Sequence, residues 1–111
     1  MSGWRAKLAL LAGLGLLALA GQALAQPDQA AQGKAVYEDN CASCHRGSGQ
    51  GLPPTFPPLK GSALAQGQPT PLIDLVLKGR KGLATMPSWQ GSLSPEQIAA
   101  ALTYVRQAWG T

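Results

Sequence analysis

Two cysteines and a histidine lie within five residues of this chain, and they are the side chains best suited to chemistry. The segment reads Cys41-Ala42-Ser43-Cys44-His45, and it contains both cysteines and the single histidine of the 111 residues. The spacing C-x-x-C-H is that of covalent haem attachment. Two thiols at this spacing on a helix end can reach the two vinyl groups of one porphyrin. The residue that follows then presents its imidazole to the iron from the same side.

Other uses of a cysteine pair fit this segment less well. A disulfide between residues so close together would constrain the unfolded chain very little. A thioredoxin-like motif would follow a strand in a βαβ pattern, which is absent here. A structural zinc ion needs four ligands, whereas this neighbourhood supplies two cysteines and one histidine. We therefore expect one covalently attached haem c.

Met86 is the candidate for the second axial ligand of such an iron. It is the only methionine beyond Met1, it follows Gly82, and it precedes Pro87, which removes a backbone donor and stiffens the loop. A lone methionine can also be a core residue that fills a gap. As a ligand, its soft sulfur would favour ferrous iron and raise the potential. The sequence thus predicts six-coordinate iron, closed to small molecules, which favours electron transfer over catalysis.

The first 25 residues have the three parts of a secretory signal peptide. A start with Arg5 and Lys7 is followed by a run of Leu, Ala and Gly, and the stretch ends on Ala-Leu-Ala at Ala25. We expect cleavage there, which leaves residues 26–111 as one domain in the periplasm. The apolar run could instead remain as a membrane anchor, because a span needs roughly 17 to 25 apolar residues.

The charge of the expected domain argues against nucleic acid as a partner. Residues 26–111 contain seven Lys and Arg against five Asp and Glu, a net charge of +2, and two haem propionates would bring it to about zero. No basic run is interleaved with aromatic residues. We expect redox proteins as partners, with long-range steering that responds only mildly to salt. A membrane is expected only if the N-terminal segment is retained.

The elements that must position these groups are predicted to be helices. A serine cap, a proline at the first position and a Ser-x-x-Gln capping box begin a helix from about Ser94 to Trp109. Weaker signals predict helices at about Asp28 to Cys41 and, beginning at Thr70 and Pro71, at about 71–78. No strand is predicted. The apolar stripe of the last helix is Ile98, Leu102, Val105 and Trp109.

Gly33 and the long loop from Arg46 to Gly61 suggest how these helices pack. Glycine within a helix costs about 1 kcal/mol relative to Ala, so Gly33 predicts close approach of another backbone or of a large side chain, with Tyr104 as the candidate. The alternative is that Gly33 is simply tolerated. The loop is rich in Gly and Pro and is expected to wrap an apolar body. Large apolar residues are few, which predicts a fold completed by a cofactor.

These parts, taken in order, resemble the class I cytochrome c family over essentially all of residues 26–109. The resemblance implies an all-α fold, a small cytochrome c globule of three to four helices wrapped round one haem, with the first and last helices crossing near Gly33 and Tyr104. It also implies that the Pro57 carbonyl accepts a hydrogen bond from the imidazole of His45, with Pro58 as the other residue in register. The matching segments are Cys41 to His45, Pro57 to Gly61, Met86-Pro87 and Leu102 to Arg106.

The resemblance also implies a function. The expected protein is a periplasmic one-electron carrier with His45 and Met86 as axial ligands, and not an enzyme, between a dehydrogenase donor and an oxidase or other acceptor. The alternative is a cytochrome subunit or anchored component of a respiratory complex. A peroxidase or gas binder would need a distal polar group, and no second histidine exists to provide one.

Two further features near Met86 could bind haem propionates. The indole of Trp89 could donate a hydrogen bond, although packing against the haem is the plainer interpretation. The cations Lys78, Arg80 and Lys81 could pair with propionates or dock an acidic partner, or they could simply be a solvated helix end.

Overall fold

The chain is helical in a computed structural model that describes residues 28–110. The predicted signal peptide and its cleavage point after Ala25 lie outside the described residues. Of the expected domain, residues 28–110 are described. Within that range the structure contains five helices and no ladder of strands, which confirms the all-α class. Two of the five are single turns of four residues, α3 and α4. The helices are α2 (Gln29–Asn40), α3 (Ala42–His45), α4 (Ala63–Gln66), α5 (Pro69–Lys78) and α6 (Pro95–Ala108).

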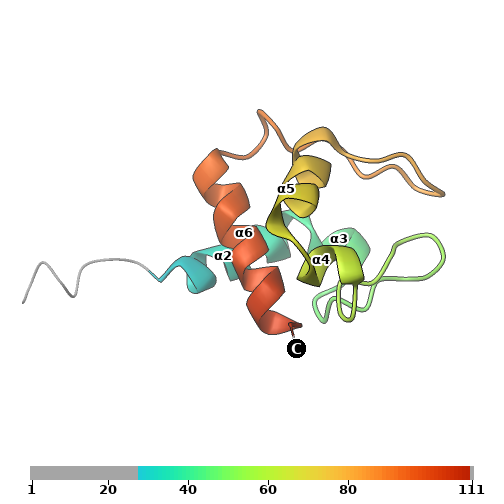
Figure 1. The fold of residues 1–111 in the computed structure, drawn as a ribbon, viewed down its shortest axis with the longest axis horizontal. Helices are drawn as coiled ribbons and strands as arrows, with labels where there is room; N and C mark the ends of the chain where they lie inside the picture. Colours follow the sequence, from blue (N-terminus) through green and yellow to red (C-terminus); the bar gives the residue numbers. More distant parts are fainter. Residues whose placement is uncertain (1–27, 111) are drawn as a thin grey trace, which may run out of the picture.

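The first and last of these helices, α2 and α6, cross and form the closest helix pair of the fold (Figure 1). A Cβ atom at Gly33 would lie 1.9 Å from the carbonyl oxygen of Ala100 and 3.0 Å from the Cβ of Tyr104. The first distance is too short for any Cβ atom, and the second is tighter than ordinary van der Waals contact. The predicted close approach at Gly33 is therefore confirmed, and the nearest group is the backbone of Ala100, with Tyr104 beside it.

Helix α6 begins with the capping box that its sequence predicts. The Ser94 hydroxyl accepts a hydrogen bond from the Gln97 amide at 3.1 Å, and the Gln97 side chain accepts one from the Ser94 amide at 2.9 Å. These bonds satisfy two amides that the first turn leaves without helical partners. Ile98 and Val105 of the predicted stripe are buried, and Leu102 is half-buried.

The start of α5 differs from the prediction. The helix begins at Pro69, with Gln68 as N-cap and no side-chain cap, so Thr70 lies inside the first turn and is not the cap. Pro69 and Pro71 both fit there, because amides of the first turn have no partner within the helix. A prolyl ring therefore removes no hydrogen bond at either position.

An aromatic cluster closes one end of the α2/α6 pair. Tyr37 is fully buried, with its ring centroid 5.6 Å from that of Tyr104 and 5.2 Å from that of Trp109. Its hydroxyl donates a hydrogen bond to the carbonyl of Arg46 at 2.6 Å. Burial, reinforced by nearby Cys41, raises the pKa of Tyr37 well above its usual range, so this phenol is neutral at physiological pH.

The loops after α3 and α5 extend on the same side of the molecule (Figure 1). The loop after α3 is folded back on itself, since the amides of Leu59 and Lys60 both donate to the carbonyl of Gly49, at 2.7 and 3.0 Å. Leu52 and Phe56 exchange two backbone hydrogen bonds, at 2.8 and 2.9 Å. Across residues 28–110, no helix has the length and apolarity needed to cross a membrane.

Candidate haem site

A cleft lies between the helices and the two loops. It consists of two cavities, of about 900 and 800 Å³ with the solvent space at their mouths included. The cavities adjoin, because six residues line both of them. The shared residues are Cys41, His45, Pro57, Arg80, Met86 and Trp89.

The walls of the first cavity are mostly aliphatic. Many large apolar side chains of the small domain therefore face the cleft, including the buried core residues Leu72, Ile98 and Val105. An apolar concave surface of this kind is typical of a ligand-binding site. The aliphatic residues from α5 and α6 are Leu72, Leu75, Val76, Ile98, Ala101, Leu102 and Val105.

The junction between α2 and α3 positions the two thiols. Cys41 ends α2 through its amide, which donates to the Tyr37 carbonyl at 2.8 Å, and its own carbonyl accepts from the His45 amide at 3.0 Å. Both cysteines are free and half-buried; Cys41 lines both cavities, and Cys44 lines the second. Burial, with a smaller effect of Cys44, raises the pKa of Cys41 to about 11. The Cys41 thiol is therefore neutral at pH 7, as its apolar surroundings require.

The imidazole of His45 is fixed by the loop opposite. Its Nδ1 lies 2.8 Å from the carbonyl oxygen of Pro57. A carbonyl can only accept, so Nδ1 carries the proton, and the lone pair of Nε2 is free to bind a metal. The structure thus places the carbonyl of Pro57, and not that of Pro58, against this ring, as the family resemblance implies.

A glycine allows the Pro57 segment to come this close. Gly51 has φ +62°, and a Cβ atom there would lie 2.4 Å from the Phe56 carbonyl oxygen and 2.8 Å from the Pro57 carbonyl carbon. The Gly51 amide also donates to the His45 carbonyl at 2.9 Å. Backbone of the loop therefore packs directly on the end of α3, and it carries the hydrogen-bond acceptor to the imidazole.

Met86 reaches the cleft from the second loop. Its amide and carbonyl exchange hydrogen bonds with the backbone of Arg80, at 2.8 and 3.0 Å. Gly79 makes this pairing possible, because a Cβ at that residue would lie 2.5 Å from the Met86 carbonyl oxygen. Its φ of 76° and ψ of −178° also fall in a region that essentially only glycine adopts. The sequence interpretation singled out Gly82, but Gly79 is the glycine that the ligand loop requires.

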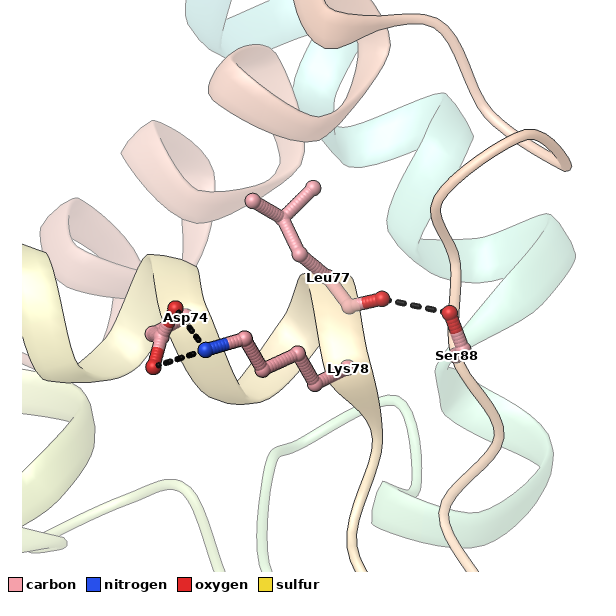
Figure 2. Close-up of polar contacts among 4 residues, drawn as sticks. All are labelled: Asp74, Leu77, Lys78 and Ser88. Atoms are coloured by element: carbon pink, nitrogen blue, oxygen red, sulfur yellow. Dashed lines mark hydrogen bonds and ion pairs between the residues drawn. The ribbon is translucent and has the colours of Figure 1, made fainter.

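The far end of the loop returns to α5. The Ser88 hydroxyl donates to the carbonyl of Leu77, in the last turn of α5 (Figure 2). The Trp89 amide donates to the Val76 carbonyl at 3.1 Å. These bonds satisfy carbonyls that the end of a helix leaves without partners. No residue pattern in the sequence predicted either bond, since both depend on where the loop returns.

These groups fit a haem. A ring nitrogen and a thioether sulfur from separate elements line the same space, two thiols border it, and its walls are apolar. Residues 28–110 contain no cluster of three or more His, Cys, Asp and Glu that could hold a metal ion by themselves. The donors available in the cleft are one imidazole, one thioether and two thiols, which suits an iron already held by a porphyrin.

Comparisons with known proteins agree with this geometry. The family model described as "Cytochrome C oxidase, cbb3-type, subunit III" matches residues 28–105. The chain is 38% identical over 110 residues to a protein named cytochrome c-552 from Thermus thermophilus, covering 87% of this chain and 70% of that protein.

Two larger proteins also match. The cytochrome c subunit of an alcohol dehydrogenase (quinone) from Gluconacetobacter polyoxogenes is 33% identical over 87 residues, which are 70% of this chain and 19% of that subunit. A cbb3-type cytochrome c oxidase subunit CcoP from Azospirillum is 35% identical over 102 residues, 86% of this chain and 33% of that subunit. The chain therefore spans between a fifth and a third of the length of these two relatives.

Proposed function

This chain belongs to the class I cytochrome c family, whose members carry covalently bound haem c, and on that premise we propose that it is a one-electron carrier. The haem is attached through Cys41 and Cys44 and ligated by His45 and Met86. One observation carries the proposal: the imidazole and the thioether come from different elements and line the same two cavities. The proton on Nδ1 of His45 leaves Nε2 as the ligating atom.

The residues of the cleft have distinct roles in this proposal. Bound haem supplies an iron that accepts and donates a single electron. Cys41 and Cys44 would hold the porphyrin covalently, each through one thioether bond. His45 and Met86 would be the two protein ligands of the iron and would leave no site on it for a substrate. The aliphatic walls exclude water, and the sulfur ligand raises the potential.

We propose further that residues 1–25 are a signal peptide and that residues 26–111 are the cytochrome domain, located in the periplasm. The sequence of the first 25 residues supports export, and covalent haem attachment suits an exported protein. The first helix of the described structure is compatible with this boundary, because the N-cap of α2 is Asp28, three residues beyond Ala25.

A second function is favoured by the names of the larger relatives. Both the dehydrogenase protein and the oxidase protein are subunits of complexes, so this chain could serve as the cytochrome component of one. The haem site is the same under this alternative, but the partner is fixed. The two functions differ in purification from the native cells: a free carrier elutes alone without detergent, whereas a component elutes with its complex.

A spectroelectrochemical titration, combined with intact-mass measurement, tests the proposed function. The exported protein should have the mass of residues 26–111 plus one haem. The double variant Cys41→Ser, Cys44→Ser should have the mass of the polypeptide alone. The titration should fit a single reversible one-electron couple, with a tenfold change in ratio per 59 mV. A chain without covalent haem, or a haem that cannot be cycled reversibly, contradicts the proposal.

A further inference from the structure

The cleft that we assign to haem contains one feature that its ligands and apolar walls do not explain. Arg80 lines both cavities. Among the described residues that line either cavity, it is the only Lys, Arg, Asp or Glu side chain. A cationic group in an otherwise apolar cleft suits a ligand that has a negative group as well as an apolar body.

The two neighbouring cations are not placed for the same role. Lys78 forms an ion pair with Asp74 at 3.0 Å on the exposed face of α5 (Figure 2). Lys81 lines neither cavity. The ion pairs within residues 28–110 are Lys78–Asp74 and Lys34–Glu38, so Arg80 has no carboxylate partner in the described part of the chain. Of the three cations near Met86, Arg80 alone faces the cleft and remains without a partner there.

The backbone of Arg80 is held in place by the ligand loop. Its amide and carbonyl both pair with Met86, and Gly79 allows the close approach of the two segments. The guanidinium therefore starts from a residue whose position is tied to that of the iron ligand. This coupling fixes the backbone from which the positive side chain extends, and Arg80 itself is exposed to solvent.

We propose that Arg80 binds a haem propionate and raises the reduction potential of the haem. The guanidinium fork matches the two oxygens of a carboxylate, which lysine does not reproduce. A positive charge beside the haem favours the ferrous state, which carries one positive charge fewer than the ferric state. A propionate neutralised by Arg80 also stabilises the ferric iron less. Both effects raise the potential.

This inference rests on the proposed haem site, and its test separates the two. Arg80→Gln removes the charge and keeps the backbone bonds to Met86, Arg80→Lys keeps the charge and loses the fork, and Lys81→Gln is the matched neighbour outside the cleft. Each haem-loaded variant is titrated by spectroelectrochemistry. Arg80→Gln should shift the reduction equilibrium several-fold toward the ferric state. The shift should stay below tenfold, which corresponds to about 59 mV, because the side chain is exposed to solvent. Lys81→Gln should shift it much less.

Redox-difference infrared spectra provide the second readout. The propionate carboxylate bands should move in Arg80→Gln and Arg80→Lys and stay in place in Lys81→Gln. Equal potentials and unmoved bands in Arg80→Gln, with an unchanged haem spectrum, would overturn the role of Arg80 and leave the haem proposal intact. If Arg80→Gln does not load haem, the carboxylate bands of Arg80→Lys decide by the same criterion. A wild-type protein without covalent haem would overturn the proposed function itself.

Discussion

The α2/α6 crossing and the two loops around the cleft are held by different forces. At the crossing, side chains and backbone touch directly, with Gly33 against Ala100 and the aromatic cluster alongside. The loops are held by backbone hydrogen bonds, such as the pair between Arg80 and Met86, and they face the cleft that we assign to haem. The α2/α6 crossing, which we call the frame, therefore determines the stability of the fold. The two loops determine the ligation and the potential of the iron.

A substitution at the crossing should have the largest effect. Gly33→Ala places a methyl group 1.9 Å from the Ala100 carbonyl oxygen, so the helices must separate. We expect a loss of about 2 to 4 kcal/mol in the free energy of unfolding, measured by denaturant titration of the haem-loaded protein. Gly47→Ala is the matched control, because a Cβ there would meet nothing within 4 Å. Equal losses in the two variants would contradict the close approach.

A substitution in the ligand loop should change the iron more than the fold. Gly79→Ala combines a backbone conformation that costs about 1 to 3 kcal/mol with a contact to the Met86 carbonyl. We expect the Met86 ligand to be displaced in part, seen as carbon monoxide binding to the reduced protein. Gly91→Ala is the control, since its φ is also positive but nothing lies within 4 Å of its Cβ position. If carbon monoxide bound both variants alike, strain alone and not the Met86 contact would be responsible.

Tyr37 links the frame to the loop after α3, and its burial should make the free energy of unfolding depend on pH. Burial raises its pKa above the usual value of about 10, so above that pH the unfolded chain loses this proton while the folded chain keeps it. The free energy of unfolding should therefore fall above about pH 10. Tyr37→Phe should lose about 1 kcal/mol at pH 8, because the Arg46 carbonyl loses its donor, and should show a smaller decline at high pH. Parallel curves for the two proteins would contradict this assignment.

The smallest effect is expected at the start of α6, where Ser94 and Gln97 line neither cavity. Ser94→Ala removes the acceptor for the Gln97 amide and should cost about 1 kcal/mol in the free energy of unfolding. The reduction potential should not change, because the cap contributes to the frame alone. A shift in potential comparable to that of Arg80→Gln would show that the frame and the iron site are not separable in this way.

The same division explains what the sequence could predict. The cap of α6, its buried stripe and the notch at Gly33 depend on side-chain types at fixed spacings, and all three are found in the structure. The His45 ring faces Pro57, as the family resemblance implies. The candidate ligands Cys41, Cys44, His45 and Met86 surround one cleft, but their binding of haem stays a prediction.

Other features could not be predicted from residue patterns. The single-turn helices α3 and α4 are too short to show a period. The start of α5 at Pro69 has no side-chain cap to mark it. The requirement for Gly79, and the bond from Ser88 to Leu77, arise from backbone groups that every residue has. Only the path of the chain in space determines which of them meet.

The central claim is that Met86 closes the iron opposite His45, and carbon monoxide tests it most directly. Optical spectra of the reduced, haem-loaded protein are recorded with and without the gas, for the wild type and for Met86→Ala. The account predicts that the wild-type spectrum ignores carbon monoxide and that the Met86→Ala spectrum changes on addition. Ready binding to the wild type, or the same insensitivity in both proteins, would contradict ligation by Met86.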